Sequence, residues 1–197
     1  KSTPLEQRII AEDQIAEFVK ADCEKLGIPA ANVFHDSTGR GSLVGAFARL
    51  WSANIGLIEF GGKPTERLVS SDIRVTARDY YSKRVSELWF NVALTIQSGQ
   101  FRGMTEDLLT EGSSREWGFV GGNRIEVETK SNMKLKTGRS PDLFDALVCG
   151  VEGAIQRGFL IKRLIAAGAI AHGDKWKQRY VDRMQKLEAN HRLNYSA

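Results

Sequence analysis

Residues 124–148 read RIEVETKSNMKLKTGRSPDLFDALV, and the fold prediction starts from the helix that begins inside this stretch. Ser140 and Pro141 form a strong helix start, because a Ser hydroxyl can cap free backbone N–H groups and Pro is well accepted at the first helical position. Asp142 then falls in the first turn, and Asp145 lies three residues later on the same face. Apolar residues at helical spacing predict that the rest of this helix is buried.

The two acids of this helix have different explanations. An acid in the first turn complements the helix dipole, which is worth ~0.3–1 kcal/mol and suffices to explain Asp142. Asp145 lies beyond that turn, beside Phe144 and Leu147, and needs another cause. Hard divalent cations prefer carboxylate oxygens, so a metal site is the alternative, and it requires a third acid from elsewhere in the chain.

The composition is that of an ordinary globular protein in which the charge is unevenly distributed. The 197 residues, 42% of them hydrophobic, suffice for one domain and an appendage. From Gln156 onward there are nine Lys or Arg and three acids, whereas the preceding part has 19 basic and 21 acidic residues. A basic tail favours a polyanion or an acidic protein surface as partner, although a solvated tail explains the same charge.

No membrane or secretory segment is visible in the sequence. No apolar run approaches the roughly 20 residues of a membrane span, and no signal peptide is found. The two cysteines, Cys23 and Cys149, form no metal-binding pattern, so a reducing cytosol is the expected compartment. The chain begins at Lys1, without Met, which suggests a processed or excised piece of a longer protein.

The first half of the chain follows the alternation of helices and strands that is typical of α/β proteins. The predicted elements are a helix (4–26), a strand (31–36), a glycine-rich turn (37–42), a helix (43–51), a strand (54–60) and a loop (61–76). Asp36 ends the first strand, where such folds build sites, although a turn-forming role also explains it. The turn lacks the Lys of a phosphate-binding P-loop, so nucleotide binding is not predicted there.

The second half carries a hairpin signal between helices. Its predicted elements are a helix (78–97), a shorter helix opened by Thr105, strands 117–120 and 124–130, a basic loop (131–138), the helix begun by Ser140, an apolar helix (158–171) and a basic helix (175–190). Gly121, Gly122 and Asn123 form the hairpin turn, and alternation in the second strand predicts that Ile125 and Val127 share one face. The polar residues Arg78, Lys83, Arg84 and Glu87 are expected on a solvent face of the long helix.

Three separated stretches together resemble the nuclease domain of the large terminase subunit of tailed bacteriophages. They are DSTGRG at 36–41, YSKRVSELW at 81–89, which is similar to the family's Tyr-x-x-Arg-x-x-Glu-x-Trp helix, and Glu128-x-Lys130 leading to SPDLFDAL at 140–147. Each stretch is weak alone, but their order and spacing agree over about residues 5–155.

The resemblance implies an RNase H-like α/β fold. The expected architecture is a mixed sheet flanked by helices, with a β-hairpin, in a nuclease domain over 1–155, followed by a basic helical extension over 156–197.

The resemblance also implies that such a domain is a metal-dependent endonuclease that cuts concatemeric DNA during genome packaging. Two divalent metals, Mg²⁺ or Mn²⁺, would activate water and stabilise the leaving oxygen. The acids implied as metal ligands and catalytic residues are Asp36, Asp142 and Asp145, and the residues implied to hold DNA phosphates are Lys130, Lys134, Lys136 and Arg139.

The implied partners are double-stranded DNA, the portal protein and the small terminase subunit, in the host cytoplasm at the procapsid and away from any membrane. The chain departs from the family at one point, since no strand with an Asp precedes Pro4 and the first acid of the family has no equivalent. The expectation is the later part of a nuclease domain, with weak or no metal binding unless another chain supplies that acid. The alternatives are a non-catalytic module that binds DNA or the portal, and another RNase H-like nuclease such as a junction resolvase.

Overall fold

The computed structural model describes residues 5–38, 41–71 and 73–162. In chain order the elements are α1 (Leu5–Lys25), the 3₁₀ turn η1 (Ala30–Asn32), β1 (Phe34–Asp36), α2 (Gly41–Leu50), β2 (Gly56–Ile58), α3 (Ala77–Tyr80), α4 (Arg84–Gln97), α5 (Glu106–Ser114), β3 (Trp117–Val120), β4 (Arg124–Val127), α6 (Lys130–Thr137) and α7 (Asp142–Gln156). No helix of the described residues combines the length and the hydropathy that a membrane span requires.

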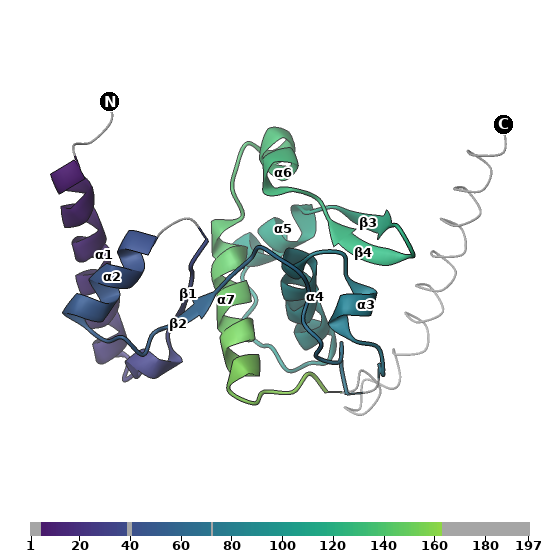
Figure 1. The fold of residues 1–197 in the computed structure, drawn as a ribbon, viewed down its shortest axis with the longest axis horizontal. Helices are drawn as coiled ribbons and strands as arrows, with labels where there is room; N and C mark the ends of the chain where they lie inside the picture. Colours follow the sequence, from purple (N-terminus) through teal and green to yellow (C-terminus); the bar gives the residue numbers. More distant parts are fainter. Residues whose placement is uncertain (1–4, 39–40, 72, 163–197) are drawn as a thin grey trace.

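The helix α7 is central, and the strands β1 and β2 lie along one side of it (Figure 1). These strands are parallel, with Phe34 opposite Gly56 and Asp36 opposite Ile58. The ring of Phe34 lies so close to Gly56 and to Gly153 of α7 that a Cβ on either glycine would be about 2 Å from it. The two glycines therefore allow the strands to approach α7 closely.

The main core lies between α7 and α4. It contains buried residues of α4, β2, β4 and α7, namely Ile58, Leu88, Trp89, Val92, Val127, Phe144, Val148, Cys149 and Val151. A second, smaller cluster joins α1 to α2 through Ala16, Ala46 and Phe47. The pair α1–α2 thus covers the side of β1 and β2 that faces away from α7 (Figure 1).

The hairpin β3–β4 is confirmed, with the predicted turn. Its strands pair in antiparallel register from Trp117 opposite Val127 to Val120 opposite Arg124. Gly122 and Asn123 have φ values of 76° and 63°, the left-handed conformation that glycine and asparagine tolerate best. Ile125 and Val127 are buried, as the alternation in this strand predicted.

The prediction of one helix over 78–97 was wrong, because the chain leaves the helix at Tyr81. This residue has extended backbone angles, forms an isolated parallel bridge with Ile125, and separates α3 from α4. The Ser82 N–H donates to the carbonyl of Ile125 at 3.0 Å, and the Lys83 ammonium lies 2.6 Å from the Glu126 carboxylate. The Tyr81 N–H still donates to the Ala77 carbonyl, and the contact with β4 replaces the helical hydrogen bond that the Ser82 N–H would otherwise make.

The solvent face expected for Arg84 and Glu87 was also wrong. Both are buried, together with Glu152 of α7. The Arg84 guanidinium bridges Glu87 and Glu152, at 2.7 Å from each, and Arg67 reaches Glu152 at 2.7 Å from the loop before α3. Burial is possible because opposite charges meet across the two helices, and Arg67 and Thr65 donate hydrogen bonds to the two carboxylates.

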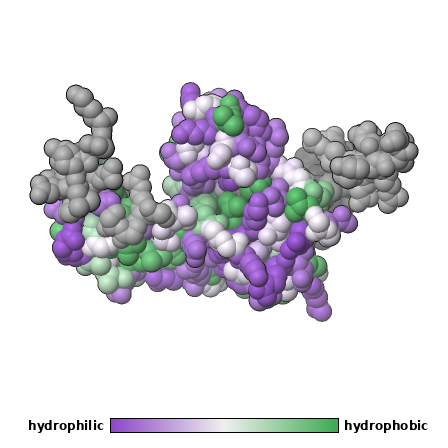
Figure 2. Space-filling view, turned by 45° about the horizontal axis from the view of Figure 1, so that its top comes forward, coloured by the Kyte–Doolittle hydropathy of each residue, from purple (hydrophilic) through white to green (hydrophobic). Residues whose placement is uncertain are grey.

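Most of the segment 131–138, predicted as a loop, is helical, since α6 runs to Thr137. The Thr129 hydroxyl accepts a hydrogen bond from the Asn132 N–H, and Gly138 ends α6 with a φ of 71°. Met133 is the one buried residue of this helix, so the sequence shows no apolar periodicity from which α6 could be predicted. In Figure 2 the projecting part of the molecule that contains α6 is mostly hydrophilic, and hydrophobic residues gather below it.

The expected single mixed sheet is not present in the described part of the chain, where β1–β2 and β3–β4 form two separate two-stranded sheets. The helix α7 ends at Gln156, and Gly158 has a φ of 93°, so the start of the predicted helix over 158–171 is not helical. The remainder of that segment and the predicted basic helix over 175–190 lie outside the described residues.

Candidate functional site

The most constrained acid of the predicted site is Asp145, which is buried on α7 and has a different partner at each oxygen. The indole N–H of Trp89 donates to its Oδ1 at 3.3 Å, and the ammonium of Lys130 lies 2.6 Å from its Oδ2. Burial raises the pKa of Asp145, and the hydrogen bond from Lys130 opposes that shift. The carboxylate is thus held in one orientation at the boundary between core and solvent.

The second acid, Asp142, lies on the solvent side of the same ammonium. Its side chain is 80% exposed, and its Oδ1 is 3.9 Å from the Nζ of Lys130. Lys130 begins α6, directly after the hairpin. The structure therefore brings Asp142 and Asp145 together around one positive charge, as a pair three residues apart on a helix predicts.

The start of α7 differs in detail from the prediction. The helix begins at Asp142, with Pro141 at the N-cap position and no capping hydrogen bond from a side chain at that position. The Glu111 carboxylate of α5 accepts the Phe144 N–H at 2.9 Å instead. An acid from a neighbouring helix thus takes the place that Ser140 was expected to fill, and ties α5 to the first turn of α7.

The third acid, Asp36, ends β1 beside α7. Its Oδ1 accepts the Thr38 N–H at 2.7 Å, which is the turn-forming role considered from the sequence. Burial raises the pKa of the Cys149 thiol to about 12, and the charges of Asp36 and Asp145 add to the shift. Cys149 thus lies near both carboxylates. The residues described contain no cluster of three or more His, Cys, Asp or Glu side chains that could hold a metal ion.

The four predicted phosphate-binding residues differ in their surroundings. Lys130 contacts the acids of α7, and Lys134 is exposed on α6. The Lys136 ammonium lies 2.9 Å from Glu116 and 2.8 Å from Glu128, and the hydrogen bonds that it donates to Glu128 and Glu116 raise its pKa. The charge of Lys136 is therefore partly neutralised by two acids, whereas Lys134 has no such ion pair among the described residues.

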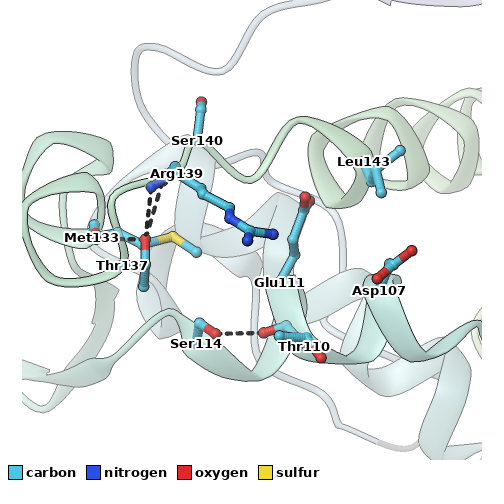
Figure 3. A pocket seen from close by; sticks show the side chains of 9 residues that line it. All are labelled: Asp107, Thr110, Glu111, Ser114, Met133, Thr137, Arg139, Ser140 and Leu143. Atoms are coloured by element: carbon cyan, nitrogen blue, oxygen red, sulfur yellow. Dashed lines mark hydrogen bonds between the residues drawn. The ribbon is translucent and has the colours of Figure 1, made fainter.

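Arg139 lies at a polar cavity of about 450 Å³ between α5, α6 and the start of α7. The cavity is lined by Asp107, Thr110, Glu111, Ser114, Met133, Thr137, Arg139, Ser140 and Leu143. In Figure 3 the side chains of Arg139 and Glu111 extend toward one another across it. Since Ser140 and Leu143 flank Asp142 in the chain, this cavity adjoins the exposed acid.

Two residues around Asp145 were not predicted as parts of the site. Trp89 ends the stretch at 81–89 that carries the family resemblance, but no role in the site was expected for it. The guanidinium of Arg115 lies 4.4 Å from the centre of the Trp89 ring, and its Nε donates to the Glu128 carbonyl at 2.9 Å. No sequence signal pointed to Arg115, because its partners come from other elements.

The comparisons with known proteins agree with this fold. No protein-family model matches the sequence, and no curated protein matches it. Among solved structures, the nuclease domain of the large terminase subunit of bacterial virus Sf6 matches with a TM-score of 0.51 and 18% identity, over 69% of this chain and 70% of that one. A structure of a mutant gp2c of the large terminase subunit from bacteriophage Sf6, solved with calcium, matches with a TM-score of 0.50 and 16% identity, over 69% of this chain and 70% of that one. The chain therefore has the fold of a phage terminase nuclease domain.

Proposed function

We propose that this chain is a metal-dependent DNA endonuclease domain of a phage packaging terminase. The observation that carries the proposal is the convergence of Asp142 and Asp145 on one cationic group, in a fold shared with a terminase nuclease domain. A position that holds an ammonium between carboxylates suits a divalent cation, since both are positive groups that carboxylate oxygens bind.

The residues that would hold Mg²⁺ or Mn²⁺ are Asp142 and Asp145, with Asp36 from the end of β1. Bound there, a pair of such ions would activate a water and stabilise the leaving oxygen in phosphodiester hydrolysis. In the structure described, the Lys130 ammonium lies 2.6 Å from Asp145 and 3.9 Å from Asp142, and a cation bound by these acids would leave it free to contact a phosphate. Arg139, three residues before Asp142, and the exposed Lys134 of α6 would add positive charge for contacts to the DNA backbone that do not depend on sequence.

By the same resemblance, the substrate is concatemeric double-stranded DNA in the host cytoplasm, and the portal protein and the small terminase subunit are the expected partners. The net positive charge from Gln156 onward, with nine Lys or Arg against three acids, suits either DNA or an acidic protein surface.

The test is nicking of supercoiled plasmid by the 197-residue chain with Mg²⁺ or Mn²⁺, beside Asp142→Ala and Asp145→Asn. Nicking that EDTA abolishes and that both variants lose, with circular dichroism unchanged, is the expected result. Nicking that survives in both variants would contradict the proposed site. Cleavage of branched DNA in preference to linear DNA would instead point to a junction resolvase.

A second candidate function is a non-catalytic module that binds DNA or the portal. It is favoured by the absence of a three-acid metal cluster among the residues described. It predicts salt-dependent binding of a labelled duplex, measured by fluorescence anisotropy, that Asp36→Ala and Asp142→Ala leave unchanged. Loss of residues 175–192 should weaken that binding, and the folded chain should not nick plasmid.

A further inference from the structure

The two oxygens of Asp145 are held by donors of very different mobility. Oδ1 accepts the N–H of Trp89, a ring of which 5% is exposed, while Oδ2 faces Lys130, whose side chain is 47% exposed. An exposed lysine has four flexible carbon–carbon bonds and can move away, whereas a buried indole cannot. Oδ1 therefore has the partner of fixed position, and Oδ2 is the oxygen whose partner can change.

The Trp89 ring is itself fixed by neighbours from two other elements. The ring of Phe144 packs against it with 4.4 Å between the centroids, and the Arg115 guanidinium lies 4.4 Å from its centre. Arg115 is buried and anchored by its hydrogen bond to the Glu128 carbonyl. A Cβ at Gly112 would lie 2.2 Å from the Phe144 ring, so α5 leaves just enough room for this packing.

We propose that Trp89 is a positioning residue that turns the Asp145 carboxylate so that Oδ2 faces a cation. That cation is the Lys130 ammonium in the structure described and a divalent metal in the active protein, so the metal part of this inference rests on the proposed function. Arg115 acts one step further away, by holding the indole ring in place. Partners of this kind around a metal ligand typically change metal affinity ~10–100-fold when they are removed.

A purely structural role for Trp89 makes a different prediction. A buried indole N–H needs an acceptor in any protein, and Asp145 could serve only as that acceptor. In that case Trp89→Phe, which keeps a ring but removes the N–H, would lower stability and leave cation binding unchanged. Metal affinity and stability therefore have to be measured separately.

The experiment titrates the full chain with Mn²⁺ and follows free Mn²⁺ by electron paramagnetic resonance. Only binding that Asp145→Asn abolishes is counted. Trp89→Phe is expected to raise the Kd for Mn²⁺ about 10-fold. The matched control is Trp117→Phe, because Trp117 of β3 packs on Phe119 of the same strand and on Phe90 of α4 and, within the described part of the chain, forms no hydrogen bond with Asp145, so the Kd should stay unchanged. An unchanged Kd in folded Trp89→Phe would overturn the proposal.

Should Trp89→Phe not fold, Arg115→Gln provides the second variant. It loosens the ring without removing the N–H, so a smaller increase in the Kd for Mn²⁺ is expected. An unchanged Kd in that variant would contradict the role assigned to the ring.

The experiment distinguishes a chain that has no metal site from a chain in which Trp89 does not position Asp145. If the unaltered chain binds no more Mn²⁺ than Asp145→Asn does, the proposed metal site is contradicted. The orientation of Asp145 is then decided without metal, by the coupling energy between Lys130 and Asp145 from a double-mutant cycle with Lys130→Met and Asp145→Asn. That coupling should fall when the cycle is repeated with Trp89→Phe, and an equal coupling would overturn the positioning role.

Discussion

Arg84 and Glu152 join α4 to α7 inside the protein, with the Arg84 Nη2 2.7 Å from the Glu152 Oε1. The contact matters for the site because α4 carries Trp89 and α7 carries both acids. The cluster around this pair also includes Glu87 and Arg67, so the loop before α3 is tied to the same two helices.

Arg84→Met is expected to lower the free energy of unfolding by about 3–5 kcal/mol, because it removes the buried guanidinium that lies 2.7 Å from both Glu87 and Glu152 and leaves only Arg67 to balance the two buried acids within the described cluster. Urea denaturation measures the loss. The matched control is Arg78→Met, whose ion pair with Glu66 is more than half exposed and should be worth about 0–1 kcal/mol. Equal effects of the two substitutions would contradict the buried cluster.

Two glycines of α7 should respond in opposite ways to alanine. Gly153→Ala places a methyl group about 2.2 Å from the Phe34 ring and should cost roughly 1–3 kcal/mol through overpacking. Gly150 has no other atom within 4 Å of a Cβ and is exposed in the same helix. Gly150→Ala should therefore stabilise the protein by about 0.4–1 kcal/mol. Thermal unfolding of both variants separates these outcomes, and a stabilising Gly153→Ala would refute the close approach of β1 to α7.

The Glu128 carboxylate should make stability depend on acid pH. Burial acts to raise the pKa of Glu128, but hydrogen bonds from Lys136 and from the Glu116 N–H bring it below the ordinary value of 4.5. Because the folded pKa is the lower one, the ionised group stabilises the protein above about pH 4.5, and this contribution is lost as the pH falls toward the folded pKa. Glu128→Gln should be less stable than the unaltered chain at pH 7, and the difference should shrink in urea titrations below pH 4.5. A difference that grows on acidification would have the wrong sign.

Lys130 should compete with a divalent cation for Asp145. Lys130→Met removes the ammonium that lies 2.6 Å from Oδ2, so Mn²⁺ should bind several-fold more tightly, as measured by calorimetry. Lys134→Met changes an exposed lysine of the same helix and serves as the control, because it removes the same charge without touching the acid. If both variants change the affinity for Mn²⁺ equally, the effect comes from the overall charge of the protein, and direct competition by Lys130 is contradicted.

Local signals in the sequence determined several elements correctly. The hairpin followed from Gly-Gly-Asn between the residues 117–120 and an alternating second strand, and the start of α5 followed from Thr105, whose hydroxyl accepts the Leu108 N–H. Asp36 was placed at a strand end, and Asp142 and Asp145 at a helix start, from patterns of fewer than ten residues. These features depend on neighbours in the chain, so the sequence alone was sufficient for them.

Other features were decided by contacts between distant segments. Arg84 and Glu87 occupy a polar face of α4, and periodicity cannot tell that this face meets Glu152 of α7 rather than water. Likewise α6 has a single buried residue, Met133, so its hydrophobic pattern was too weak to predict a helix.

The sequence by itself determined the α/β class, the hairpin and the pair of acids at the start of α7. Only the tertiary structure decided that Asp145 is buried between Trp89 and Lys130 while Asp142 faces solvent, and that Arg115 lies against Trp89. The reason is physical. Residue type and spacing set which face of a helix a side chain occupies, but its desolvation and its hydrogen-bond partners are set by the elements that pack against that face.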